Sequence, residues 1–80
     1  MSVKVNGQDI DVVHVRYDGR SYDVQTGDLL IQEASQQELF SALENNLDLG
    51  YGSLNGYELD VVVSTRTAVA RPQAKFGIDG

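Results

Sequence analysis

Apolar and polar residues alternate along the first third of the chain, and this pattern predicts antiparallel β-strands. Residues 11–24 carry Asp18-Gly19 at their centre, a dipeptide that favours a two-residue hairpin turn. Counting outward from this turn pairs Tyr17 with Arg20, Val15 with Tyr22 and Val13 with Val24 on one face, and Arg16 with Ser21 and His14 with Asp23 on the other. One face of the hairpin is therefore apolar and the other polar, as in a sheet covered on one side.

A shorter hairpin is predicted ahead of this one. Residues 3–10 have Asn6-Gly7 in the middle, a turn whose two positions both need positive φ. After the second hairpin, residues 29–34 form a short apolar run that fits either a strand or the first turns of a helix, because periodicity cannot separate the two over so few residues.

Residues 35–47 have the periodicity of an amphipathic helix. Ser35 followed by Glu38 is a capping-box pattern, and it predicts that the helix begins there. One apolar stripe follows at helical spacing, formed by Leu39, Phe40, Leu43 and Leu47. We expect this stripe to pack on the apolar face of the sheet, and Gly50 and Gly52 to end the helix.

The last regular element predicted is a strand over residues 57–65, because apolar side chains alternate along it. Residues 67–70 either extend this strand or pair with it. Pro72 has no N–H group, so it ends a strand or lies at its edge.

Together these elements predict an α+β protein in which one helix packs on a four- or five-stranded antiparallel or mixed sheet. A chain of 80 residues allows a single domain. We expect residues 1–70 to form that domain and residues 71–80 to form a flexible C-terminal tail that ends in Gly80.

The composition narrows the classes of function. The chain has no cysteine, which excludes disulfides, zinc–thiolate sites and a cysteine nucleophile. A net charge of −6 argues against a general nucleic-acid binder, which needs basic residues to contact phosphates. No apolar run approaches the roughly 20 residues that span a bilayer, and the first residues do not have the pattern of a signal peptide. We therefore expect a cytoplasmic protein whose partners are neither nucleic acids nor membranes.

No group of residues forms a recognisable catalytic or metal site. His14 opposite Asp23 has the geometry of an oriented base, but no serine or threonine is placed as its nucleophile, and a surface pair is the simpler interpretation. Asp9 and Asp11 share a strand face, yet two carboxylates do not supply the roughly six oxygen ligands that Ca²⁺ needs. We predict that the protein is not an enzyme and holds no metal.

The order of hairpin, helix and strand or strand pair resembles the β-grasp fold of ubiquitin-like proteins, over residues 3–70. The resemblance implies a mixed sheet crossed by one helix, with the N-terminal and C-terminal strands parallel in the middle of the sheet. The apolar run V61-V-V63 fits a strand buried on both faces, as expected for a central position.

The last ten residues, R71-P-Q-A-K-F-G-I-D-G80, are similar in general make-up to the tails of ubiquitin-like modifiers. In that family an E1-like enzyme uses ATP to activate the carboxylate of the terminal glycine. An E2-like carrier then passes it to a target. By this resemblance Gly80 is the conjugated residue, the enzymes recognise Arg71, Lys75, Phe76 and Asp79, and the protein itself binds no cofactor. The ending I78-D-G80 departs from the diglycine common in the family.

A second hypothesis is a small acidic interaction module, an adaptor or inhibitor, that binds a partner protein through its sheet face or edge. Val62 is predicted to point outward on the face opposite the helix, which makes it the candidate contact residue. Residues 66–71 offer a segment that could add as a strand to a partner. The two hypotheses differ in whether function depends on Gly80.

Overall fold

The computed structural model describes residues 2–73, which form strands, one α-helix and two short 3₁₀ helices. The elements in chain order are β1 (Val3–Val5), β2 (Gln8–Ile10), β3 (Val12–Tyr17), β4 (Arg20–Gln25), η1 (Thr26–Leu29), β5 (Glu33–Ala34), α1 (Gln36–Asn46), β6 (Tyr57–Val62), η2 (Val63–Thr65) and β7 (Thr67–Pro72). The α+β class predicted from the sequence is confirmed.

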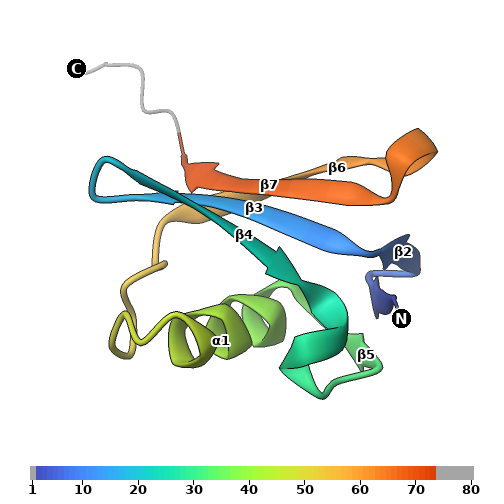
Figure 1. The fold of residues 1–80 in the computed structure, drawn as a ribbon, viewed down its shortest axis with the longest axis horizontal. Helices are drawn as coiled ribbons and strands as arrows, with labels where there is room; N and C mark the ends of the chain where they lie inside the picture. Colours follow the sequence, from blue (N-terminus) through green and yellow to red (C-terminus); the bar gives the residue numbers. More distant parts are fainter. Residues whose placement is uncertain (1, 74–80) are drawn as a thin grey trace.

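The described strands form two sheets, so the prediction of one four- or five-stranded sheet is wrong. A four-stranded sheet has the order β4-β3-β7-β6, and a three-stranded sheet has the order β2-β1-β5. Figure 1 shows the larger sheet as one layer with α1 across its lower face, and β2 and β5 toward one end. The first hairpin therefore does not join the main sheet.

The hairpin β3–β4 confirms the pairing predicted from the sequence. Val13 lies opposite Val24, and Val15 lies opposite Tyr22. The turn residue Asp18 has φ 52° and Gly19 has φ 74°, which is the backbone that a tight hairpin turn requires. A shift of one residue would turn the buried valines to solvent, so the turn and the apolar face specify the same register.

The centre of the larger sheet is a parallel pair, but it is formed by β3 and β7, not by the first and last strands. The N-terminal strand β1 has only three residues and pairs instead with β2 and β5. The prediction for V61-V-V63 is also wrong, because β6 is an edge strand in which Val62 is 45% and Val63 is 65% exposed. The two central positions go to β3 and β7, which have six residues each and whose Val13, Val15, Ala68 and Ala70 are fully buried.

The predicted strand over residues 57–65 ends at Val62. The chain turns through η2, and Arg66 takes a left-handed conformation with φ 55°. β7 then pairs antiparallel with β6, starting from Thr67 opposite Val62. This hairpin loop contains no glycine, proline, asparagine or aspartate, and Ser64 alone is too weak a signal to predict a turn.

The ambiguous residues 29–34 are mostly neither helix nor strand. The 3₁₀ helix η1 ends at Leu29, and Leu30 adopts a left-handed conformation with φ 59°. Only the last two residues form a strand, β5, which pairs parallel with β1.

The helix α1 begins as predicted. Its Ser35 hydroxyl accepts a hydrogen bond from the Glu38 N–H, and the Glu38 carboxylate accepts one from the Ser35 N–H at 2.9 Å. It ends before the predicted glycines, because Asp48 takes the left-handed conformation with φ 57°. The Leu49 N–H then donates to the Glu44 carbonyl at 2.9 Å, which completes a Schellman-type C-cap with aspartate in the usual glycine position.

One hydrophobic core joins both sheets and the helix. The small sheet contributes Val3, Val5 and Ile10, and each is at most 1% exposed. The fully or nearly buried residues of the larger sheet, the helix and the following loop are Val13, Val15, Val24, Ala68, Ala70, Leu39, Phe40, Leu43 and Leu54. The opposite face of the larger sheet has no cover within residues 2–73.

Candidate functional sites

Two of the residues predicted to belong to the tail, Arg71 and Pro72, lie in β7. The Arg71 guanidinium forms an ion pair with Asp60, and its Nε lies 3.5 Å from the Glu58 carboxylate. Arg71 is therefore fixed to the neighbouring strand β6. The other predicted tail residues, Lys75, Phe76, Asp79 and Gly80, lie outside the described residues.

Val62 lies on the uncovered face of the larger sheet, as predicted from its alternation. Thr67 on β7 lies opposite Val62, and Val12 on β3 lies on the other side of Thr67, so all three are on the same face. Thr67 and Val12 are partly buried. This gives a short row of weakly polar and apolar side chains at one end of a face whose other positions are mostly polar or charged, apart from Val69 on β7.

The predicted His14–Asp23 pair is present. The two side chains share a hydrogen bond of 2.6 Å between His14 Nδ1 and Asp23 Oδ1, and both are largely exposed. Within residues 2–73 no serine or threonine hydroxyl is bonded to this histidine. The pair therefore links β3 to β4 on the open face, and the described chain adds no nucleophile to it.

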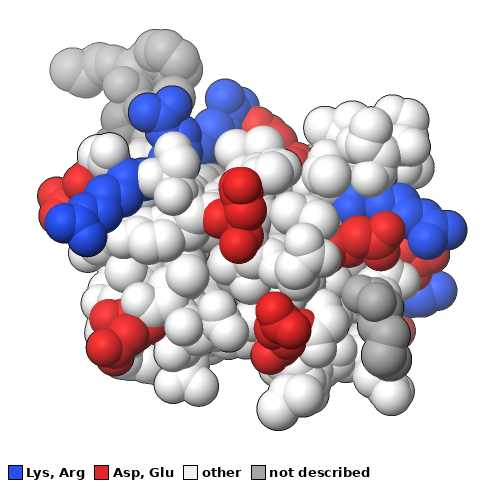
Figure 2. Space-filling model, viewed as in Figure 1, with Lys and Arg blue, Asp and Glu red and all other residues white. Residues whose placement is uncertain are grey.

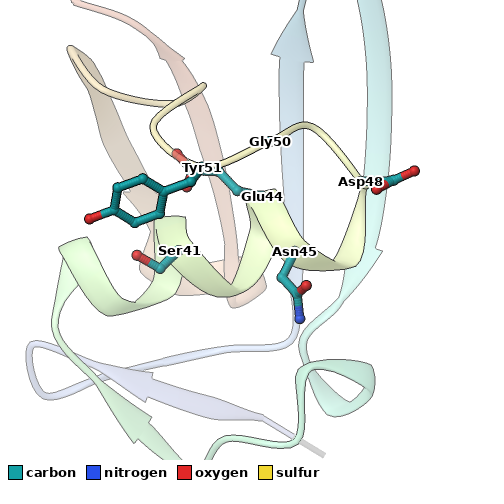
Figure 3. A pocket seen from close by; sticks show the side chains of 6 residues that line it. All are labelled: Ser41, Glu44, Asn45, Asp48, Gly50 and Tyr51. Atoms are coloured by element: carbon teal, nitrogen blue, oxygen red, sulfur yellow. The ribbon is translucent and has the colours of Figure 1, made fainter.

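A shallow hollow lies between the exposed side of α1 and the loop that follows it (Figure 3). It has a volume of about 220 Å³, and Ser41, Glu44, Asn45, Asp48, Gly50 and Tyr51 line it. The Tyr51 side chain is 98% exposed and stands at its rim. A second hollow of about 200 Å³ shares Ser41, Glu44 and Tyr51 and continues toward Tyr57 at the start of β6.

Glu44, at the bottom of both hollows, is only 6% exposed. Its carboxylate oxygens accept hydrogen bonds from the Gly52 N–H at 3.0 Å and the Leu54 N–H at 2.8 Å. Both oxygens are therefore used to fix the loop that places Leu54 in the core. The sequence analysis missed this residue, although Glu44 falls four residues after Phe40 on the buried stripe, where a carboxylate signals a buried partner.

Tyr57 is the second residue that the sequence analysis missed. Its hydroxyl donates a hydrogen bond of 2.7 Å to the Arg16 carbonyl at the end of β3. If the β3–β7 register is continued, that carbonyl faces position 72, where proline has no N–H to donate. The phenol replaces the missing amide, and burial, followed by the nearby Tyr17 and Asp18, raises the pKa of Tyr57 above its ordinary value.

Charge is distributed unevenly over the molecule. Figure 2 shows acidic side chains standing alone on the middle and lower parts of the visible face, while lysines and arginines gather toward its two sides. Among the described acids, Glu38 has a pKa below its ordinary value, chiefly because it accepts the Ser35 backbone hydrogen bond.

Residues 2–73 contain no cluster of three or more side chains suited to hold a metal ion. No helix within residues 2–73 is long and apolar enough to cross a membrane. No protein-family model, curated protein or solved structure matches the chain.

Proposed function

We propose that this chain is a ubiquitin-like protein modifier with a β-grasp arrangement, and that Gly80 is the residue joined to its targets. The observation that supports the proposal is the strand order β4-β3-β7-β6 with a parallel pair, β3 and β7, at its centre. The chain passes from β4 to β6 by way of α1, which crosses one face of the sheet (Figure 1). This order is similar to that of β-grasp proteins when β1, β2 and β5 are treated as additions.

The position of β7 fits the requirements of a modifier. β7 is a central strand, and the ion pairs of Arg71 with Glu58 and Asp60 hold the C-terminal end of β7 against β6. The Gln73 N–H donates to the Gly56 carbonyl at 2.9 Å, so this anchoring continues to the last described residue. Because the end of β7 is held in the sheet, the residues after Gln73 could enter an enzyme while the domain stays folded.

The proposal divides the roles among the residues of this end of the chain. Arg71 fixes the base of the tail, while Lys75, Phe76 and Asp79 provide the side chains that an E1-like enzyme recognises. ATP binds to that enzyme and activates the Gly80 carboxylate, since a glycine without a Cβ can enter a narrow channel. In this proposal the protein is a substrate and a tag, and its partners are the E1-like and E2-like enzymes and the targets.

The test is a search for the tail on other proteins in the native host. The proposal requires a mature chain that ends at Gly80, whether synthesised so or cut from a precursor. Trypsin cleaves after Lys75 and leaves F76-G-I-D-G80. Mass spectrometry should find this peptide joined through Gly80 to a lysine, serine or threonine of another chain.

Two alanine variants make the search specific. Gly80→Ala should abolish the conjugates, whereas Gly77→Ala, the same change within the tail, should leave them detectable. If the pentapeptide is recovered at good coverage only in its free form or within an uncut chain, the modifier proposal fails.

A further inference from the structure

The larger sheet has two edges within the described chain, and they differ in what they offer to a partner. Its order places β4 at one edge and β6 at the other. Edge strands expose unpaired N–H and C=O groups, and natural proteins protect them with charges, prolines or bulges. Neither β4 nor β6 contains a proline. β4 pairs with β3, and β6 pairs with β7, without a break along their whole length.

The outer edge of β6 presents the backbone of Leu59 and Val61. The Gln73 N–H bonds to the Gly56 carbonyl, so Gly56 belongs to the residues that bond to β7. Backbone direction alternates along an antiparallel strand, and the N–H and C=O groups of Leu59 and Val61 therefore point away from β7. β7 is the only described strand that pairs with β6, so these groups have no strand partner within residues 2–73.

The side chains at these two positions are apolar and only partly covered. Leu59 and Val61 pack against the core from the helix side, but both remain half-buried. At β4, by contrast, counting from the turn places the outward backbone groups at Ser21 and Asp23, whose exposed polar side chains already interact with solvent or with His14. A strand added to β6 would bury the apolar surface of both Leu59 and Val61, whereas Tyr22 is the one partly exposed apolar side chain on the helix side of β4.

The charges on the other side of β6 indicate the chemistry of the added strand. Glu58 and Asp60 share the single guanidinium of Arg71 and are themselves 38% and 49% exposed, so one negative charge in this trio is left without a partner. A basic side chain opposite them in the added strand would supply the missing cation.

A second copy of this chain is a poor occupant for the same reason. If β6 pairs with β6 about a two-fold axis at Asp60, the two Asp60 carboxylates lie directly opposite. An axis at Leu59 sets Glu58 opposite Asp60. An axis at Val61 avoids both clashes, but it would pair Leu59 with a residue beyond Val62, where β6 has ended.

We propose that the outer edge of β6 is a docking strand for an extended segment of a partner protein in which apolar and basic residues alternate. The segment forms backbone hydrogen bonds with Leu59 and Val61, places its apolar side chains beside theirs, and sets its basic side chains opposite Glu58 and Asp60. This interaction is independent of conjugation through Gly80.

The test uses an acetylated and amidated peptide, matched in length to β6, in which valine and lysine alternate. The protein is the full chain, and amide hydrogen exchange is followed by NMR. Binding should slow the exchange of the Leu59 and Val61 N–H groups. The equivalent peptide with glutamate in place of lysine should bind at least about fivefold more weakly, because several exposed charge pairs change sign.

Two variants with the same change in charge test the position of the docking strand. Asp60→Asn should weaken binding of the lysine peptide about two- to fivefold, whereas Asp28→Asn, on η1 and away from the sheet edge, should not change it. Gly80→Ala should bind the peptide as the original chain does.

Three results would overturn the proposal: no protection of Leu59 and Val61 at millimolar peptide, protection along β4 instead, or equal binding of the lysine and glutamate peptides. A rise in apparent mass of the protein alone, with β6 protected, would show self-pairing and would also overturn it.

Discussion

The two sheets contain hairpins with the same kind of turn, yet they have different roles. Asn6-Gly7 and Asp18-Gly19 both adopt positive φ and both reverse the chain tightly. The first joins strands of three residues each, and the second joins strands of six residues each. Turn chemistry therefore specifies where a hairpin forms, while strand length and apolar coverage decide which hairpin becomes the centre of the fold.

The small sheet nevertheless contributes to the same core. Ile10 is fully buried, and the parallel pairing of β1 with β5 brings the chain before α1 back to the N-terminal hairpin. Two sheets that share one core should unfold together, since neither can keep its apolar face covered alone.

The largest expected effect comes from truncating a core residue of the small sheet or of the helix. Ile10→Ala in β2 and Leu43→Ala in α1 both remove side chains that are 0% exposed. Each should lower the free energy of unfolding by about 2–5 kcal/mol, through lost burial and the cavity that remains. Urea unfolding followed by circular dichroism measures both.

The informative outcome is the shape of the Ile10→Ala transition. We expect one transition for residues of both sheets when amide signals are followed by NMR at increasing urea. Separate loss of β1 and β2 signals, with β3 and β7 signals intact, would show that the small sheet is an independent unit.

The next effect is expected where the two sheets meet. Thr26 is fully buried, and its hydroxyl lies 2.7 Å from the Ile10 carbonyl and 3.0 Å from that of Asp11, at the link between β2 and β3. Thr26→Val keeps the shape but removes the donor, and should cost about 1–3 kcal/mol of stability because buried carbonyls lose a partner. Thr65→Val, at an exposed hydroxyl, is the control and should change little. If the two variants lower the stability equally, the Thr26 hydrogen bonds do not stabilise the junction between the sheets.

A smaller effect is expected at the open end of the larger sheet. Tyr57→Phe removes the hydrogen bond to the Arg16 carbonyl and should cost about 0.5–1.5 kcal/mol, measured by urea unfolding at neutral pH. The matched control is Tyr51→Phe, whose side chain is 98% exposed.

The same variant has a signature in its pH dependence. The pKa of Tyr57 is raised above 10.0, so the folded chain holds this proton more tightly than the unfolded chain. Its contribution is complete below about pH 10 and is lost as the pH rises through the folded pKa. The original chain should therefore lose stability above that pH, and Tyr57→Phe should lose less. Parallel curves for the two proteins would contradict the proposed role of burial.

The smallest effect is expected at the N-terminus of α1. The pKa of Glu38 is lowered from 4.5 by the hydrogen bonds with Ser35, so its contribution is present above that pH and is lost as the pH falls through the folded value. Thermal unfolding of Glu38→Gln should show a flatter pH dependence below about pH 5, with Glu33→Gln as the control. If the two variants have the same acid profile, the capping box does not carry this dependence.

Some features follow from the sequence because nearby residues determine them. The β3–β4 register follows from Asp18-Gly19 and from the apolar side chains that alternate along each strand, Val13 and Val15 on β3 and Tyr22 and Val24 on β4. The start of α1 follows from Ser35 and Glu38, whose hydrogen bonds close within one turn. The helix stripe also follows, because its spacing is a local property.

Only the tertiary structure decided which strands became neighbours and which groups came together. The contact of Tyr57 with Arg16 spans 41 positions, and the ion pairs of Arg71 with Glu58 and Asp60 depend on β7 lying beside β6. β6 ends at Val62, where the chain turns through a loop that lacks glycine, proline, asparagine and aspartate, and β7 then pairs with β3. Local patterns encode turns, caps and faces, whereas strand order is the result of competition among all strands for one core, and no short segment of sequence contains that information.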